Sequence, residues 1–292
     1  MDIKQVVILG ASGFIGSAIR EFLKIQGIAS EIIAISSSEV DLTNLKEVYS
    51  LKKYFKKTTA ILMCSNLKRN VGDNLDTFLG NMSMCENLCV LLQDHHVGRF
   101  IYFSSAAVYG EEINNLNITE TTNVYPMTYY GIAKYSSECL FRKAISSHGK
   151  TSFIIFRTSI VYGSNDRSNS YGPSEFINSN INSNEIVLWG DGEELRDFIY
   201  IKDVAKIVIK MIFNKFDGII NLSSGSSHTF QEVVELSSCI SNTKTLVSSR
   251  KRTKEKVNHI YNNSLLNRLL PNYQYTSLEE GMKDTFISLT KK

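Results

Sequence analysis

The stretch YYGIAKYSSE, residues 129–138, places tyrosines on both sides of one lysine. On a helix, residues four apart share a face, so Tyr130 and Lys134 are predicted neighbours. Tyr129 and Tyr135 do not have this spacing. A nearby ammonium lowers the pKa of a phenol, and a tyrosine tuned in this way can exchange a proton with a substrate hydroxyl or carbonyl. The alternative is a packed tyrosine covered by the lysine stem.

A serine follows the predicted strand RFIYFS at residues 99–104. Ligands of open α/β sheets bind outside the carboxyl ends of the strands, which is where Ser105 stands. Its hydroxyl would hold a substrate oxygen within reach of Tyr130. We therefore predict Ser105, Tyr130 and Lys134 as the catalytic residues.

A glycine-rich turn, GASGFIG at residues 10–16, joins a predicted strand at 4–9 to a predicted helix at 14–26. Glycines permit a tight turn and close approach of the backbone to a ligand. The free N–H groups and the positive dipole end of a helix N-terminus suit a pyrophosphate. The junction therefore predicts a dinucleotide site. Its predicted contacts are Gly10, Ser12, Gly13, Phe14, Ile15 and Gly16.

The second predicted strand, at 31–35, bears on the choice between NADP and NAD. An acid at the end of this strand usually bonds the ribose 2′-hydroxyl of NAD. Here the strand is followed by Ser36, Ser37 and Ser38, and no arginine stands beside them. We expect NADP or NAD as cofactor, with Ser36 as a contact, and the missing acid favours NADP.

The elements that must position these residues alternate between strand and helix. Strands are predicted at 4–9, 31–35, 60–64, 99–104 and 152–156, and helices at 14–26, 42–55, 74–95 and 129–147. This alternation predicts βαβ units on a parallel sheet that is buried on both faces. Since such crossovers are right-handed, we expect an α/β, Rossmann-like, doubly wound fold.

The alternation becomes irregular after about residue 160. We expect a dinucleotide-binding domain at 1–160 and a smaller, mainly substrate-binding lobe at 161–292. Segments at about 200–225 are expected to return to the first domain, because residues 219–222 read as a further strand.

Composition excludes several classes of protein. A net charge of +3 over 292 residues is too mild to predict nucleic-acid binding. No apolar stretch is long enough to span a membrane, and the first residues do not form a signal peptide, so we expect a cytoplasmic protein. The five cysteines form no metal-binding set, so we expect reduced packing residues and no metal.

Several motifs together resemble one enzyme family. The GxxGxxG turn, Ser105 and the YxxxK pair resemble the extended short-chain dehydrogenases/reductases, in particular the NAD-dependent epimerase/dehydratase family of nucleotide-sugar enzymes. Further matches are Arg157…Val161-Tyr162-Gly163 to RxxNVYG, residues 190–205 to GxGxxxRDFxxVxDVA, and residues 221–225 to NIGSG.

The resemblance implies roles for further residues. Tyr130 and Lys134 would also contact the cofactor, with Lys134 bonding the nicotinamide ribose, and Asp41 and Leu42 would lie beside the adenine. Arg196 would meet the diphosphate of a nucleotide-sugar substrate. The same substrate would also contact Ser105, Ala106 and Tyr130. Oligomers are common in the family, and the resemblance implies a homodimer as one assembly open to this chain.

Departures from the family pattern narrow the reaction. Dehydratases carry acids where Ala106 and Ala107 stand, and enzymes of the GDP-fucose synthase type carry a cysteine at the second position. Ile160 replaces the asparagine that contacts substrate in UDP-galactose 4-epimerases. We therefore expect reduction of a nucleotide 4-keto-6-deoxy sugar at C4. The alternatives are a nucleotide-sugar 4-epimerase with tightly bound NAD and, more remotely, a non-catalytic NAD(P)-sensing protein.

Overall fold

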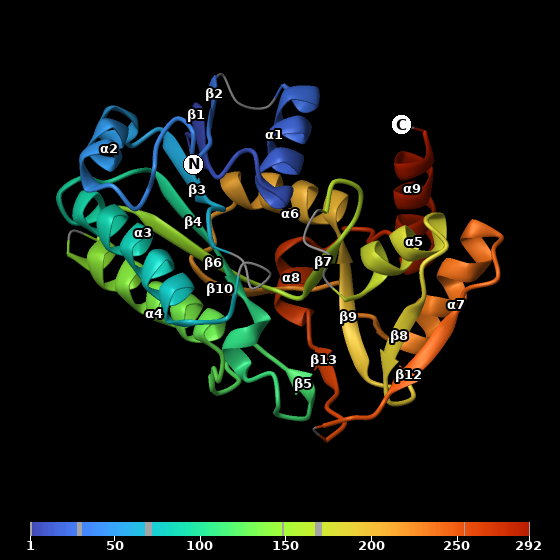
Figure 1. The fold of residues 1–292 in the computed structure, drawn as a ribbon. Coiled ribbons are helices and arrows are strands. Elements are labelled where there is room, and N and C mark those ends of the chain that lie inside the picture. Colours follow the sequence, from blue (N-terminus) through green and yellow to red (C-terminus); the bar gives the residue numbers. More distant parts are fainter. Residues whose placement is uncertain are drawn as a thin grey trace. The chain divides into compact units, whose positions relative to one another are not determined.

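The computed structural model describes residues 2–27, 31–67, 72–147, 149–166, 171–253 and 255–291. Its largest sheet has six strands in the order β10-β6-β4-β3-β1-β2 (Figure 1). β1 pairs in parallel with both β2 and β3, and β3 pairs in parallel with β4. The strands are β1 Gln5–Leu9, β2 Glu31–Ile35, β3 Thr59–Met63, β4 Arg99–Ser105, β6 Ser152–Thr158 and β10 Gly218–Leu222. The predicted α/β fold with a parallel sheet is confirmed.

Helices cover both faces of this sheet. They are α1 Phe14–Gln26, α2 Leu45–Tyr49, α3 Leu75–Asp94, α4 Tyr129–Ser146 and α6 Ile201–Phe213. α3 and α4 lie side by side on one face, and α1 and α6 lie on the other (Figure 1).

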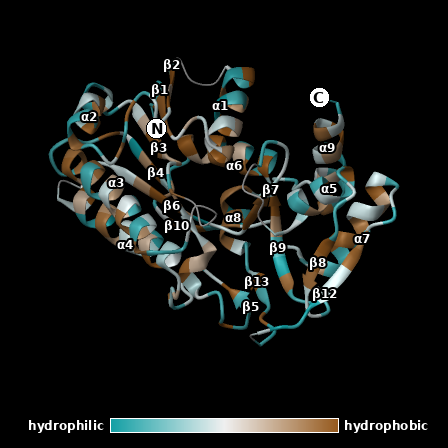
Figure 2. Cartoon of the chain, viewed as in Figure 1, coloured by the Kyte–Doolittle hydropathy of each residue, from teal (hydrophilic) through white to brown (hydrophobic). Residues whose placement is uncertain are grey.

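The core between the sheet and α2, α3 and α4 follows from the two-residue period of the strands. Alternate residues of β1 and β4 enter one apolar cluster, namely Val7, Leu9, Phe100 and Tyr102. The ring of Phe141 on α4 lies 5.0 Å from the rings of both Phe100 and Tyr102. Figure 2 shows these strands as mainly hydrophobic, whereas α3 and α4 carry both hydrophobic and hydrophilic residues.

Side-chain caps fix where the helices begin. Asn74 caps α3 through a capping box with Thr77, and Thr128 caps α4 by accepting from the N–H of Gly131. The helix predicted at 42–55 begins only at Leu45, because Asn44 caps it; the 3₁₀-helix η1 Ser50–Tyr54 continues α2.

The chain divides into two compact units. Unit 1 consists of residues 1–110, 124–157 and 204–220, and unit 2 of residues 111–123, 158–203 and 221–292.

None of the helices in the described ranges combines the length and apolar character needed to span a bilayer. Cys139 and Cys239 are exposed, so the expectation that every cysteine packs inside is wrong for these two.

Unit 2 contains three small sheets and four helices within the described residues. The sheets have the orders β11-β9-β7, β12-β8 and β13-β5. The strands are β5 Asn115–Ile118, β7 Ile160–Tyr162, β8 Ile186–Trp189, β9 Leu195–Tyr200, β11 Ser227–Thr229, β12 Val247–Arg250 and β13 His259–Tyr261. The helices are α5 Pro173–Ile181, α7 Phe230–Ser241, α8 Ser264–Leu269 and α9 Leu278–Thr290.

Candidate active site

The glycine turn after β1 is closed in a way that only glycines permit. Gly10 has φ +86°, and a Cβ on it would lie 2.7 Å from Oγ of Ser65. A Cβ on Gly16 would collide with the carbonyl of Gly10. The N–H groups of Gly10 and Ala11 both donate to the carbonyl of Ile35, at 2.8 and 3.0 Å. The turn therefore lies directly against the carboxyl end of β2.

The first turn of α1 suits an anion. Gly13 caps this helix without a side-chain hydrogen bond, and the turn contains no acidic residue. Ser12 and Gly13 are exposed, whereas Phe14 and Ile15 are half-buried. The free N–H groups and the helix dipole therefore fit the pyrophosphate of a dinucleotide.

The turn after β2 contains a carboxylate that sequence analysis missed. Oε2 of Glu39 accepts from the N–H of Ser36 at 2.8 Å and from its hydroxyl at 2.9 Å. These two bonds lower the pKa of Glu39. Glu39 stands one residue beyond the three serines that directly follow the strand. The spacing Ser-x-x-Glu of Ser36 and Glu39 could have indicated this contact, because it is typical of a glutamate side chain that accepts from the backbone N–H three residues earlier.

Asp41 and Leu42, predicted to lie near the adenine, have different surroundings. Asp41 is exposed, and its Oδ1 accepts from the N–H and the hydroxyl of Thr43, which lowers the pKa of Asp41. Leu42 is buried in the core of unit 1, and its carbonyl accepts from Nδ2 of Asn87 at 2.9 Å. Both residues belong to the connection that leads from β2 into α2.

Lys134 is buried and held in place by β4. Its Nζ donates to the carbonyl of Phe103 at 2.7 Å and lies 5.6 Å from the ring centre of Tyr130. Nζ also lies 5.0 Å from the ring centre of Tyr102. Burial lowers the pKa of Lys134 to about 8. The spacing of four residues does place this cation beside the ring of Tyr130.

Ser105 ends β4 and caps the short 3₁₀-helix η2 Ala106–Tyr109. Its Oγ accepts from the N–H of Ala107 at 3.2 Å, which leaves the hydroxyl hydrogen to donate to a ligand. A Cβ on Gly131 would lie 3.0 Å from the carbonyl of Ala107, so the first turn of α4 packs on η2. Ser105, Tyr130 and Lys134 thus belong to adjoining elements of unit 1.

A pocket of unit 1 is lined by Tyr130 and Lys134 together with Tyr102 and Asn81. Asn81, on α3, accepts from the N–H of Leu67 at 2.8 Å and donates to its carbonyl at 3.1 Å. This asparagine therefore fixes the backbone that follows β3 beside the pocket.

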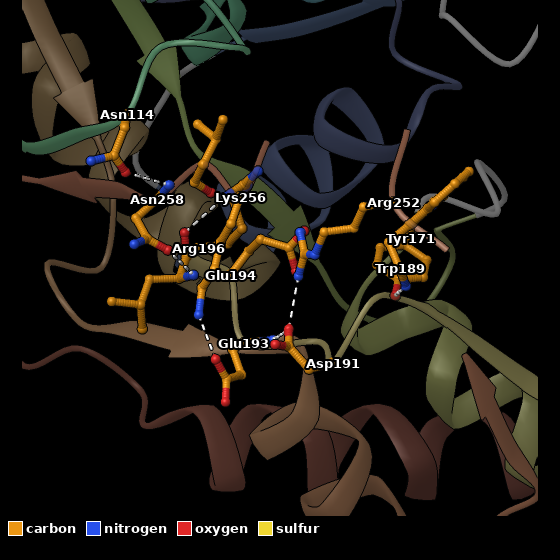
Figure 3. A network of polar contacts seen from close by, with 12 residues as sticks. Asn114, Tyr171, Trp189, Asp191, Glu193, Glu194, Arg196, Arg252, Lys256 and Asn258 are labelled. Carbon is orange, nitrogen blue, oxygen red and sulfur yellow. Dashed lines mark hydrogen bonds and ion pairs between the residues drawn. The ribbon is translucent and has the colours of Figure 1, made fainter. Parts of the chain in front are cut away.

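Arg196 belongs to unit 2, where it lies in a network of charged and polar groups (Figure 3). Its guanidinium donates from Nη1 to the carbonyl of Val257. Nearby, Arg252 forms ion pairs with Asp191, at 2.9 Å, and with Glu194. Since a guanidinium has five N–H donors, Arg196 keeps donors for an anionic ligand.

The aspartate of the RDF motif has a structural part within unit 2. Asp197 is buried, which raises its pKa. Its carboxylate accepts from the hydroxyl of Ser159 at 2.6 Å and from the N–H groups of Ser224 and Gly225 at 2.9 and 2.8 Å. It therefore joins β9 to the turn that follows β10.

Comparisons with known proteins identify the family of this chain. The model of the "NAD dependent epimerase/dehydratase family" matches residues 6–223. The "Uncharacterized UDP-glucose epimerase YtcB" of Bacillus subtilis is 25% identical, with 98% of each chain covered. The GDP-L-colitose synthase of Yersinia pseudotuberculosis is 25% identical over 78% of this chain and 79% of that protein.

Solved structures show the same fold. The Thermus thermophilus UDP-glucose 4-epimerase, a complex with NAD, superposes with a TM-score of 0.84 at 20% identity, covering 98% of this chain and 99% of that one. The match to the family model spans the glycine turn and the residues Ser105, Tyr130 and Lys134. The chain therefore belongs to the NAD-dependent epimerase/dehydratase family.

Proposed function

We propose that the protein transfers a hydride and a proton at C4 of a nucleotide-activated sugar, with NAD or NADP as cofactor. The observation that carries this proposal is the position of Lys134. Its buried Nζ lies beside the ring of Tyr130 and is anchored to Phe103, two residues before Ser105. The glycine turn and the first turn of α1 fit the cofactor's pyrophosphate, with Lys134 at its nicotinamide ribose.

When bound, the nicotinamide supplies or accepts the hydride. Ser105 donates its hydroxyl hydrogen to the C4 oxygen of the sugar, and Tyr130 gives a proton to that oxygen or takes one from it. The ammonium of Lys134 favours the phenolate form of Tyr130 and so eases both directions of transfer. Ala106 and Ala107 offer no further acid or base, which confines the chemistry to C4.

Epimerisation at C4 is the reaction that we favour. In this reaction Tyr130 would take the proton of the C4 hydroxyl while C4 gives its hydride to the nicotinamide. After the keto sugar has rotated, C4 would take the hydride back on its opposite face and the C4 oxygen would take the proton back. Similarity to a protein named as a UDP-glucose epimerase over 98% of the chain supports it. The absence of an acid directly after β2, which favours NADP and so a cofactor that is exchanged, is offset by the carboxylate of Glu39.

Reduction of a nucleotide 4-keto-6-deoxy sugar is the second candidate. It needs the same three residues and a hydride donor that is exchanged at each turnover. Ile160 at the start of β7 supports reduction. This half-buried apolar residue stands where UDP-galactose 4-epimerases carry the asparagine that contacts their substrate. Arg196 is proposed to bind the substrate diphosphate in either reaction, with Ala106 as a neighbouring contact.

The proposal is tested with the purified, unlabelled protein. The protein is first denatured, and mass spectrometry identifies any dinucleotide that it releases. It is then incubated with UDP-glucose or UDP-galactose, and NMR follows the C4 epimer. Parallel reactions with dTDP- or GDP-linked 4-keto-6-deoxy sugars and NADH or NADPH are followed at 340 nm.

Each outcome has a defined meaning. Formation of the C4 epimer without added cofactor supports epimerisation, and oxidation of NADH or NADPH by a keto sugar supports reduction. A Tyr130→Phe variant should lose either activity. Turnover of none of these substrates, with tight dinucleotide binding, would overturn the proposal in favour of a sensing protein.

A further inference from the structure

The first turn of α4 is held by two side chains that lie outside the helix. Oγ1 of Thr128, the residue before α4, accepts from the N–H of Gly131 at 3.1 Å. Oδ1 of Asp73 accepts from the N–H of Tyr130 at 2.9 Å. The first N–H groups of a helix have no carbonyl partner within it, so these bonds supply acceptors that α4 itself lacks. Asp73 therefore contacts α4 at the residue proposed to exchange the proton.

The backbone around Asp73 is itself fixed by the start of α3. Asp73 precedes Asn74, the N-cap of α3, whose side chain accepts from the N–H of Thr77 at 3.0 Å. The hydroxyl of Thr77 lies 2.9 Å from the carbonyl oxygens of both Gly72 and Asn74. Both neighbours of Asp73 are thus bonded to the first turn of α3. The carboxylate of Asp73 joins the start of α3 to the start of α4.

This contact bears on where the hydroxyl of Tyr130 lies. One turn further along α4, Nζ of Lys134 bonds to the carbonyl of Phe103 on β4. Asp73 and Lys134 together hold α4 at two points, which limits both its rotation and its sliding along its axis. Groups that exchange a proton must be held within about 0.5 Å of their productive positions. A shift of the first turn would move Tyr130 relative to Ser105.

We propose that Asp73 is a positioning residue for Tyr130, an inference that rests on the proposed function. Its carboxylate holds the start of α4 so that the hydroxyl of Tyr130 reaches the C4 oxygen bound by Ser105. The negative charge also lies at the positive end of the α4 dipole, which favours this arrangement. Since Asp73 bonds to the backbone of Tyr130, it acts on the position of the phenol and takes no part in the proton exchange.

The test measures C4 epimerisation of UDP-galactose, or NADPH oxidation by a dTDP-linked 4-keto-6-deoxy sugar, together with NADH affinity from nucleotide fluorescence. Asp73→Ala should lower kcat roughly tenfold or more, because a displacement of about 1 Å can cost about 100-fold in rate. NADH affinity should not change. Asp73→Asn should recover most of the rate, since its amide oxygen can still accept from Tyr130. The matched control is Asp76→Ala, which alters an exposed aspartate in the first turn of α3 and should keep the wild-type rate.

A double-mutant cycle separates positioning of the hydroxyl from a general loss of structure. Tyr130→Phe removes the hydroxyl, so adding Asp73→Ala should lower the residual rate of this variant by less than about twofold. Equal fractional losses in both backgrounds would show that Asp73 does not act through this hydroxyl. An undiminished kcat in Asp73→Ala would also overturn its role, and both results leave the proposed function standing. Failure of the wild-type protein to turn over any of these substrates would overturn the proposed function and the role of Asp73 together.

Discussion

Glu138 and Arg157 form a two-point ion pair inside unit 1. Nε of Arg157 donates to Oε1 of Glu138 at 3.1 Å, and Nη2 donates to Oε2 at 2.7 Å. Their side chains are only 2% and 4% exposed, respectively. The hydroxyl of Ser104 also donates to Glu138. The pair therefore joins α4, which carries Lys134, to β6 and to the end of β4, which carries Ser105.

Glu138→Gln should destabilise the protein strongly. It would leave the guanidinium of Arg157 buried without its counter-charge, and breaking a buried pair in this way costs about 3–5 kcal/mol. Urea unfolding measures the change. The control is Glu279→Gln on α9, whose pair with Lys283 is about half exposed and should contribute under about 1 kcal/mol. Equal effects of the two substitutions would show that the buried pair does not hold these elements together.

Tyr130→Phe should lower the turnover rate by roughly 10²–10⁴-fold, because it removes the hydroxyl that exchanges the proton. Dinucleotide affinity should change little. The matched control is Tyr129→Phe, one residue earlier on α4, whose exposed ring lies 6.3 Å from that of Phe78. A comparable loss of rate in both variants would place the proton exchange elsewhere.

Lys134→Met should separate activity from stability. Burial lowers the pKa of Lys134 from 10.5 to about 8, so between these pH values the unfolded chain binds more protons than the folded protein. The free energy of unfolding of the wild-type protein should therefore gain a rising contribution from Lys134 between pH 8 and 10.5. Methionine removes this contribution, together with the proposed support of Tyr130.

The measurement is the difference in unfolding free energy between Lys134→Met and the wild type at several pH values. We expect the variant to lose about 100-fold or more in turnover rate. Its stability relative to the wild type should be greatest near pH 7 and should fall as the pH rises past 8. A relative stability that grows with pH over this range would contradict the assignment of a buried ammonium.

Gly16→Ala should disrupt the glycine turn. The added methyl group would collide with the carbonyl of Gly10, which is backbone and cannot rotate away. Overpacking of this kind costs about 1–3 kcal/mol, and the shifted turn should lose dinucleotide affinity. Ser17→Ala, at the next position on α1, removes only a hydroxyl bond to the carbonyl of Phe14 and serves as the control. Undiminished NADH binding by Gly16→Ala would argue against this turn as the pyrophosphate site.

Sequence patterns predicted unit 1 well because its signals are local. β2 and α1 have the bounds predicted for them, since continuous apolar runs and a glycine stop define their ends. Most strands of unit 2 were missed, because they are three or four residues long. β5 and β13 pair in parallel although His259 and its partner Asn115 lie far apart in the chain, and such a pairing leaves no periodic signal. Glu39 was missed for a related reason, since only the folded turn returns its carboxylate to Ser36.

The division of the chain into units also limits how such a protein can diversify. Each unit is assembled from three separate segments, and boundaries between them fall inside β6, α6 and β10. A single genetic crossover therefore cannot replace one unit with that of a relative while leaving the other intact. New substrate preferences must arise by substitutions of single residues within unit 2, or by several simultaneous exchanges of segments that leave β6, α6 and β10 intact.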